Sequence, residues 1–188
     1  MAVKIHTKDA TIADLYRISE NGKAELVGGE IVLISPTGGL PRRAGGRIYR
    51  SLDDYEREMG SGYAFPDNVG FLVHLPHRKS FSPDAAFWVG QLPRGGEFLT
   101  GASRFAVEVR SENDYGPAAE QAIADKRADY FAAGTQVVWD VDVLQDGEVR
   151  SYRADAPDRP LVFRRGDLAH AEPALPGWSL AVEDLLPS

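Results

Sequence analysis

The chain has 188 residues, of which 43% are hydrophobic and 26% charged, with no cysteine and a formal net charge of −7 at pH 7. This composition is typical of a globular protein, and the lack of cysteine excludes disulfide bonds and cysteine-based metal sites, which leaves carboxylates and histidines as possible ligands. The acidic balance argues against a surface coated in DNA-binding charge, but it does not exclude a nuclease, because a metal ion can supply positive charge at the scissile phosphate.

A length of 188 residues suits one compact domain and is short for two, so we expect a single domain over residues 1–188. No stretch approaches the roughly 20 apolar residues of a membrane helix, so we expect no membrane partner. The segment Met1–His6 lacks the apolar core of a signal peptide, so we expect a cytoplasmic protein.

The N-terminal part of the chain is predicted to form a short helix and a hairpin. Thr11 followed by Asp14 is typical of a helix N-terminus, and the helix is predicted to run to about Ser19. Two β-prone runs that are joined by a pair of glycines indicate a β-hairpin, with strands over Ala24–Val27 and Glu30–Ile34.

A longer helix is predicted from about Pro41 to Met59, because its apolar residues recur on one face and Gly60 follows it. On another face of this helix Arg43, Arg47 and Arg50 are spaced at i, i+4 and i+7. This row can follow a DNA backbone. A solvated face that is balanced by neighbouring acidic residues accounts for the row equally well.

Strands predominate in the next part of the chain. They are predicted over Val69–Leu75, Phe81–Val89 and Phe105–Ser111, with a polar loop at about Gln91–Ser103. A third helix is predicted over Tyr115–Ala133. Its end signals are Asn113 or Asp114 as the cap, Pro117 in the first turn and Gly134 after the last turn.

The C-terminal part is predicted to add a second hairpin and a closing turn. Its strands are Gln136–Val141 and Glu148–Arg153, followed by a short strand near Leu161–Arg164. Asp140 and Asp142 precede the turn of the hairpin, so we expect their side chains to be exposed to solvent. The order of elements predicts one α/β domain.

Two carboxylates stand in strands that are otherwise suited to burial. Asp84 lies within Ser82–Trp88, and Glu108 lies within Phe105–Ser111. Isolated carboxylates are costly to bury unless they are paired or bind a cation. On neighbouring strands they could share one hard ion such as Mg²⁺, with the backbone carbonyl of Val109 as a further ligand. A carboxylate on the wet face of a half-exposed strand is the alternative for each residue.

Lys126 lies on the predicted third helix, in line with Ala119, Ile123, Tyr130 and Ala133 at helical spacing. In this line the lysine can point towards the sheet. The alternative is a lysine at the edge of the apolar stripe, paired with Glu120 or Asp129.

Taken together, these residues resemble the PD-(D/E)xK nuclease superfamily, and within it the chain is similar to the Uma-two family of restriction-endonuclease-like proteins. The matching segments run in the family's order over nearly the whole chain: Glu25–Glu30, Ser35–Gly38, Ser82–Asp84, Val107–Ser111, Asp125-Lys126 with Tyr130 and Gly134, and Leu175–Gly177.

The resemblance implies a restriction-endonuclease-like core, in which a mixed β-sheet is flanked by helices and carries additional β-hairpins. It implies hydrolysis of DNA phosphodiester bonds with Mg²⁺ or Mn²⁺ held by Asp84 and Glu108. The superfamily's lysine usually stands two residues after the glutamate, where this chain has Arg110. In the Uma-two group the lysine maps instead to Lys126, which would orient water or stabilise charge. Glu25 is a candidate for the outer metal shell, although a hairpin carboxylate is more often solvated.

Arg110 is a second outer-shell candidate, since an arginine cannot shuttle protons at neutral pH but can stabilise phosphate charge. Many relatives carry a histidine after the Ser35–Gly38 segment, where this chain has Arg42 and Arg43. Basic residues there suit a phosphate contact.

Three functions remain open from the sequence. The first is an active DNA endonuclease, which we expect to form a homodimer because cutting two strands usually takes two sites. The second is a nuclease-like nucleic-acid-binding or regulatory module without catalysis, which Arg110 and the acidic charge favour. The third is another carboxylate–metal hydrolase, such as a small phosphatase.

Overall fold

A computed structural model describes residues 3–5, 9–19 and 22–187. Met1, Ala2 and His6, on which the expected cellular location partly depends, lie outside these ranges. Three α-helices occur in the described ranges: α1 (Ile12–Ser19), α2 (Gly39–Met59) and α3 (Pro117–Ala133). No helix in these ranges is long and apolar enough to cross a membrane.

A six-stranded sheet forms the centre of the molecule, in the order β12-β11-β10-β9-β7-β4. Its strands β9 and β10 are parallel, and the other neighbours are antiparallel, so the sheet is mixed. The bounds are β4 (Tyr63–Pro66), β7 (Ala85–Trp88), β9 (Phe105–Val109), β10 (Val137–Asp142), β11 (Glu148–Arg153) and β12 (Ala156–Arg164).

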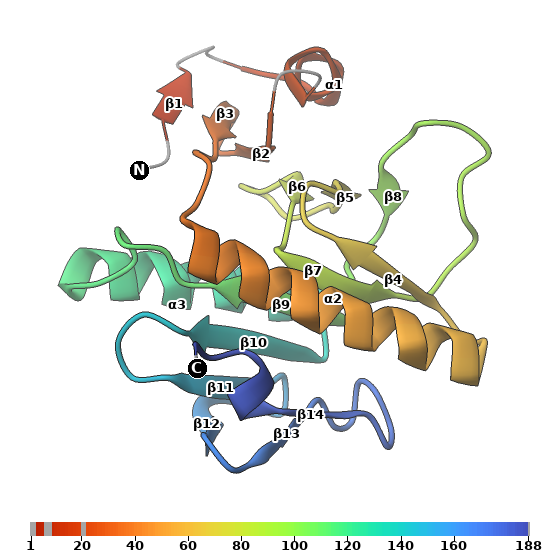
Figure 1. The fold of residues 1–188 in the computed structure, drawn as a ribbon. Helices are drawn as coiled ribbons and strands as arrows, with labels where there is room; N and C mark the ends of the chain where they lie inside the picture. Colours follow the sequence, from red (N-terminus) through yellow and green to blue (C-terminus); the bar gives the residue numbers. More distant parts are fainter. Residues whose placement is uncertain (1–2, 6–8, 20–21, 188) are drawn as a thin grey trace.

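Helices α2 and α3 cover opposite faces of this sheet, α2 in front and α3 behind (Figure 1). Ile48 and Leu52 of α2 are fully buried in the same cluster as Phe105 of β9. On the other face, Tyr130 of α3 packs with Ala106, the next residue of β9. Because side chains alternate along a strand, odd-numbered residues of β9 face α2 and even-numbered ones face α3.

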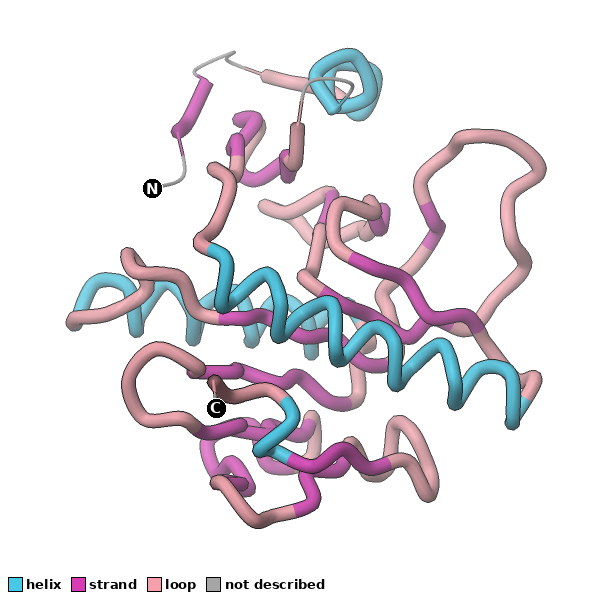
Figure 2. Tube along the Cα trace, in the orientation of Figure 1, coloured by secondary structure: helices cyan, strands magenta, loops and turns pink. Residues whose placement is uncertain are grey.

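Smaller sheets complete the fold (Figure 2). The N-terminal sheet has the order β1-β3-β2 and packs on α1 through Leu15, Leu26 and Ile31. The other sheets have the orders β6-β5-β8 and β13-β14. Their bounds are β1 (Val3–Ile5), β2 (Ala24–Val27), β3 (Glu30–Leu33), β5 (Phe71–Leu72), β6 (Ser80–Phe81), β8 (Leu99–Thr100), β13 (Leu168–His170) and β14 (Ser179–Ala181), and the 3₁₀ helix η1 (Val182–Asp184) follows.

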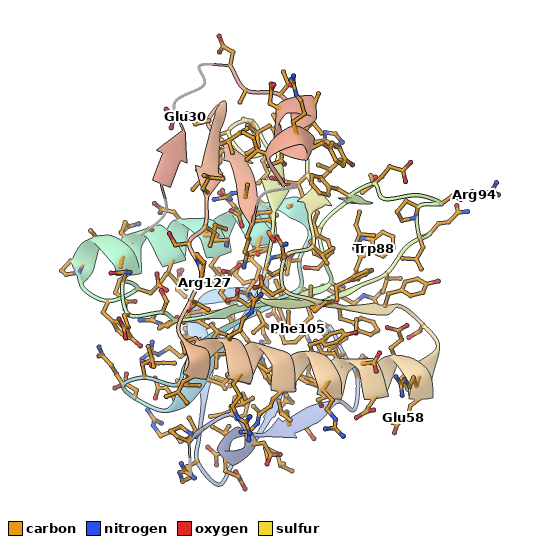
Figure 3. The ribbon with its side chains drawn as sticks, turned by 45° about the horizontal axis from the view of Figure 1, so that its top comes forward. Glu30, Glu58, Trp88, Arg94, Phe105 and Arg127 are labelled. Carbon is orange, nitrogen blue, oxygen red and sulfur yellow. The ribbon has the colours of Figure 1, made fainter. Side chains whose placement is uncertain are left out.

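Side chains divide clearly between core and surface (Figure 3). Phe105 is fully buried at the centre of the sheet, where Trp139 and Trp178 pack around it. Arg94 is exposed in the loop between β7 and β8, and Glu58 is exposed near the end of α2. The predicted α/β class, with a mixed sheet, flanking helices and hairpins, is confirmed.

Several predicted boundaries are wrong for local reasons. The strand predicted over Phe81–Val89 is two strands, β6 and β7, separated by Ser82-Pro83-Asp84. Pro83 has no N–H to donate to a ladder, so it interrupts the pairing. The predicted loop at Gln91–Ser103 contains the short strand β8, and β4 was not predicted. Helix α3 begins after Gly116, whose φ of 92° favours glycine, and not at Tyr115.

Candidate active site

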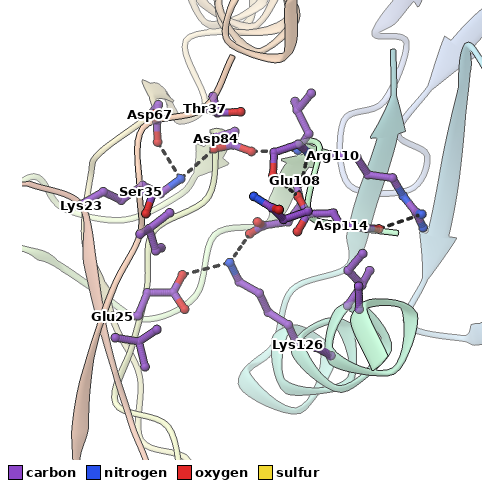
Figure 4. A pocket seen from close by; sticks show the side chains of 18 of the residues that line it. Lys23, Glu25, Ser35, Thr37, Asp67, Asp84, Glu108, Arg110, Asp114 and Lys126 are labelled. Carbon is purple, nitrogen blue, oxygen red and sulfur yellow. Dashed lines mark hydrogen bonds and ion pairs between the residues drawn. The ribbon is translucent and has the colours of Figure 1, made fainter. Parts of the chain in front are cut away.

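A cleft of about 1120 Å³ lies between the N-terminal hairpin, the α3-facing side of the central sheet and α3 (Figure 4). Distant parts of the chain meet in it, because its walls come from β2, from the loop before β7, from β9 and from α3. The charged residues that line it are Lys23, Glu25, Arg42, Asp67, Arg78, Asp84, Glu108, Arg110, Asp114, Lys126, Arg127 and Asp140.

Asp84 directly precedes β7 and Glu108 lies in the neighbouring strand β9, and both residues line the cleft. Ala85, the residue after Asp84, pairs with Val107, the residue before Glu108, in the antiparallel ladder of β7 and β9. The backbone N–H of Asp84 donates to the carbonyl of Val107 over 2.9 Å, which ties the residue before β7 to β9. The expected pairing of the two strands is confirmed, although Asp84 stands just before its strand and not within it.

Each oxygen of the Asp84 carboxylate has its own partner. Oδ2 accepts a hydrogen bond from the backbone N–H of Val109 at 2.8 Å. Oδ1 lies 2.7 Å from Nζ of Lys23, and the same ammonium lies 2.7 Å from Oδ1 of Asp67. Arg42 forms an ion pair with the other oxygen of Asp67. Sequence reasoning missed Lys23 and Asp67, because neither residue stands at a spacing that links it to Asp84.

Lys126 extends from α3 into the cleft. Its Nζ lies 2.8 Å from Oε1 of Glu108 and 3.0 Å from Oε1 of Glu25. The alternative partners expected for this lysine have other contacts: Glu120 binds Arg110, and Asp129 binds Arg78. The interpretation of Lys126 as a lysine that points towards the sheet is confirmed.

Glu25 is only 4% exposed, so the expected solvated carboxylate is wrong. Its Oε1 accepts the backbone N–H of Ser82 at 2.9 Å, and its Oε2 accepts from Arg78 at 2.6 Å. Arg78 also donates to Asp129 of α3 at 2.7 Å. The hairpin carboxylate is buried because these donors and Lys126 compensate for the loss of hydration.

The charges of the cleft shift one another's protonation equilibria. Burial alone lowers the pKa of Lys126, but the attraction of Glu108 and Glu25 outweighs burial and leaves that pKa above its ordinary value. Burial raises the pKa of Glu25, but the positive charges of Lys126 and Arg78 lower it by more than burial raises it, so the pKa lies below its ordinary value. For Glu108 burial and repulsion by Asp84 outweigh the attraction of Lys126, so its pKa is raised.

Tyr130 supports Glu108 from below the cleft. Its hydroxyl donates to Oε1 of Glu108 over 2.6 Å, and its ring stacks on Phe81 with centroids 4.0 Å apart. Burial, followed by the nearby charges of Glu108 and Glu25, holds the pKa of Tyr130 well above its ordinary value. The hydroxyl therefore remains a proton donor to Glu108 at neutral pH.

Arg110 lies in the cleft wall. Among the described residues, its hydrogen bonds and ion pairs do not include Asp84 or Glu108. Its guanidinium binds Asp140 through two hydrogen bonds of 2.7 Å and also binds Glu120. Asp140 and Asp142 are 3% and 1% exposed, so the expectation that both are solvated is wrong. Burial is possible because Arg110 pairs with Asp140, while Tyr115 and backbone N–H groups bind Asp142.

The arginine row of α2 lies outside the cleft lining. Arg43 and Arg50 are exposed, and Arg47 donates a hydrogen bond to the carbonyl of Asp184. The neighbouring Arg42 does line the cleft, where it reaches Asp67. Of the two basic residues that follow the Ser35–Gly38 segment, the one turned towards the carboxylates is therefore Arg42.

Comparison with known proteins identifies related sequences and folds. The family model described as "Putative restriction endonuclease", Uma2, matches residues 11–183. The crystal structure of "a putative nuclease belonging to DUF820" from Anabaena variabilis superposes with a TM-score of 0.67 and 18% sequence identity, covering 86% of this chain and 88% of that chain. At this identity the likeness concerns the fold. No curated protein matches the sequence.

Proposed function

The chain belongs to the Uma2 family of restriction-endonuclease-like proteins, and we propose that it is a divalent-metal-dependent endonuclease that hydrolyses DNA phosphodiester bonds. The observation that carries the proposal is the ammonium of Lys126, which bridges Glu108 and Glu25 in a cleft that also contains Asp84. A cleft with opposed carboxylates and a charged lysine can bind a cation and a phosphate side by side.

The chemistry of the donors suits Mg²⁺ or Mn²⁺. Among the described residues, no three His, Cys, Asp or Glu side chains form a complete metal site. Magnesium, however, is commonly held by one or two carboxylates while it keeps several waters. Asp84 and Glu108 would be those carboxylates. The carbonyl of Val109 would add a third oxygen, since it lies on the same edge of β9 as the N–H that reaches Asp84.

The raised pKa of Glu108 agrees with this assignment. Two neighbouring carboxylates in a partly dehydrated cleft repel each other, and a cation removes that repulsion. A bound divalent ion would polarise a phosphate oxygen and lower the pKa of water for attack on phosphorus. We therefore assign Asp84 and Glu108 to metal binding.

Lys126 is suited to stabilise negative charge. Its raised pKa keeps the ammonium protonated at neutral pH, so it is not available as a general base. As hydrolysis forms the new bond from water oxygen to phosphorus and breaks the bond to the leaving oxygen, negative charge grows on the phosphate oxygens. An ammonium held in place by Glu25 can orient the water or donate to those oxygens.

Glu25 belongs to the support of the site in this proposal. It holds Lys126 on one side and is itself held by Arg78 and Ser82 on the other. Arg110 acts one step further away, because it fixes Asp140 and Glu120 in the wall of the cleft. Both are thus outer residues that position the groups in contact with the substrate.

The decisive experiment incubates the full chain with supercoiled plasmid, with Mg²⁺ or Mn²⁺ and with EDTA. We expect nicked and linear DNA with either metal, no cleavage in EDTA, and at least about a 10²-fold loss of rate for Asp84→Asn and Glu108→Gln. Asp155→Asn is the matched control, because Asp155 is 71% exposed in side chain and pairs with Arg153 away from the cleft. Cleavage that persists in Asp84→Asn would rule out the assigned site.

A nuclease-like DNA-binding or regulatory module without catalysis is the second candidate. The observation that favours it is Arg110, which stands at the usual position of the superfamily lysine and is committed to Asp140 and Glu120. This candidate predicts that the plasmid is bound but stays intact with both metals. A small carboxylate–metal phosphatase would instead hydrolyse phosphate monoesters and leave plasmid uncut.

A further inference from the structure

Lys23 brings a second ammonium group into the cleft, and neither the sequence patterns nor the proposed reaction gives it a role. Its side chain is only 12% exposed, and its Nζ lies 2.7 Å from Asp84 and 2.7 Å from Asp67 (Figure 4). An ammonium in contact with two carboxylates at this separation is a charge-assisted interaction with both.

Lys23 neutralises the carboxylate that we assign to the metal ion, Asp84. The backbone N–H of Val109 binds Oδ2 of Asp84 and Lys23 binds Oδ1, so a cation that approaches this carboxylate meets the ammonium at one of its two oxygens. At Glu108 the situation differs, because Lys126 and Tyr130 both approach the same oxygen, Oε1. Competition between an ammonium and a metal is therefore concentrated at Asp84.

We propose that Lys23 is a positioning residue that occupies Asp84 in the metal-free protein and must move towards Asp67 when a divalent ion binds. This inference rests on the proposed function, since it assumes that Asp84 is a metal ligand. The physical reason is like-charge repulsion: an ammonium and a divalent ion that bind the same carboxylate repel each other strongly at this short distance.

Asp67 gives the displaced ammonium a second acceptor. Its Oδ1 already contacts Lys23, while Arg42 binds its Oδ2. Lys23 can thus leave Asp84 and keep Asp67 as a partner. Replacement of the ammonium by a metal ion therefore leaves no buried charge without a counter-charge. The exchange also favours divalent over monovalent ions, because a monovalent ion carries no more charge than the ammonium that it would replace.

The test measures Mn²⁺ binding to the full chain without DNA, by isothermal titration and by the electron paramagnetic resonance signal of free Mn²⁺. Lys23→Met removes the charge and retains much of the length of the side chain. We expect it to bind Mn²⁺ on the order of tenfold more tightly than the parent protein, because the competing ammonium is gone. Lys79→Met is the matched control: its Nζ donates to the carbonyl of Leu75 outside the cleft lining, so the affinity should stay within about twofold of the parent.

Asp84→Asn separates a failure of this inference from a failure of the proposed site. If Asp84→Asn abolishes Mn²⁺ binding while Lys23→Met binds Mn²⁺ no more tightly than the parent, the metal site stands and the role of Lys23 is wrong. If Asp84→Asn binds Mn²⁺ as the parent does, both the proposed metal site and the role of Lys23 are wrong. Lys23→Gln is measured in parallel, with circular dichroism as the check of folding, so that one poorly folded variant does not decide the result.

Discussion

Lys126 is the residue on which the catalytic proposal depends most directly. Lys126→Ala should reduce plasmid cleavage by about 10²-fold or more, the scale seen when one preorganised charge stabiliser is lost. Lys126→Arg should restore little, because a guanidinium is a broad planar fork that cannot occupy the site of a compact ammonium between Glu25 and Glu108. The measurement is the initial rate of nicking at saturating metal.

Lys79→Ala is the control for that change, since Lys79 carries the same charge outside the cleft lining. Arg110→Ala is a poor control, although Arg110 stands where the superfamily usually keeps its lysine. Arg110 is 5% exposed, and its loss would leave Asp140 buried without its bidentate partner, which typically costs about 3–5 kcal/mol of folding free energy. Full activity of Lys126→Ala in a folded protein would remove Lys126 from the mechanism.

At the scale of elements, the turn between β10 and β11 depends on a buried aspartate. Asp142 accepts from the backbone N–H groups of Leu144 and Gln145 and from the hydroxyl of Tyr115. Burial raises the pKa of Asp142, but these hydrogen bonds lower it more, and the net pKa lies below its ordinary value of 3.8. Asp142→Asn should therefore lower the free energy of unfolding at pH 7 by about 1.5–3 kcal/mol.

The sign of the pH dependence follows from the lowered pKa. The stabilisation by Asp142 is complete above the unfolded pKa and is lost as the pH falls through the lower folded value, so the difference between the parent and Asp142→Asn should begin to shrink near pH 3.8 and continue to shrink below it. Urea unfolding between pH 3 and pH 7 measures this, with Asp155→Asn as an exposed control. A stability difference that does not change with pH would contradict the assignment.

Helix α2 carries the proposed DNA contacts. If Arg43 and Arg50 lie along a phosphate backbone, each change to alanine should reduce the slope of log affinity against log salt by about 0.9, as one released counterion per contact requires. Arg47 should have a smaller effect, because its guanidinium already donates to the carbonyl of Asp184. Fluorescence anisotropy of a labelled duplex in EDTA gives the slopes.

Arg57→Ala on the last turn of the same helix is the matched control, since Arg57 pairs with Asp53 within the helix. Unchanged slopes for Arg43→Ala and Arg50→Ala would mean that the row is a solvated face balanced by acidic neighbours, the alternative that the sequence left open.

At the scale of the whole molecule, the cleft joins the N-terminal hairpin to the central sheet and to α3. Glu25 comes from the N-terminal hairpin, Glu108 from the central sheet and Lys126 from the helix behind it. Because none of these parts forms the cleft alone, we propose that residues 1–188 are one nuclease-like domain.

A homodimer is the assembly that suits an enzyme cutting both strands, since two sites related by twofold symmetry can address two antiparallel strands. Light scattering after size exclusion at micromolar concentration should give twice the chain mass of 20.5 kDa. A species of 20.5 kDa at these concentrations would contradict the dimer. A monomer with one site would cut only one strand in each binding event.

The sequence by itself determined the class of the fold and singled out the residues that we propose for the site. Hydrophobic periodicity and glycine end signals placed α2 and the end of α3, because these are local properties of the backbone. Carboxylates in apolar strands indicated Asp84 and Glu108, since burial of a charge demands compensation wherever it occurs. The order of short motifs led to the family.

Only the tertiary structure decided which charges meet. Lys23 and Asp84 are 61 residues apart, and Arg78 and Glu25 are 53 apart, so no periodicity links them. The burial of Asp140 was missed for the same reason: its partner Arg110 directly follows β9, the parallel neighbour of β10, and strand pairing is not local. A charged side chain is predicted from sequence to be exposed, because its burial requires a partner of opposite charge. That partner comes from a segment distant in the chain, so only the tertiary structure reveals it.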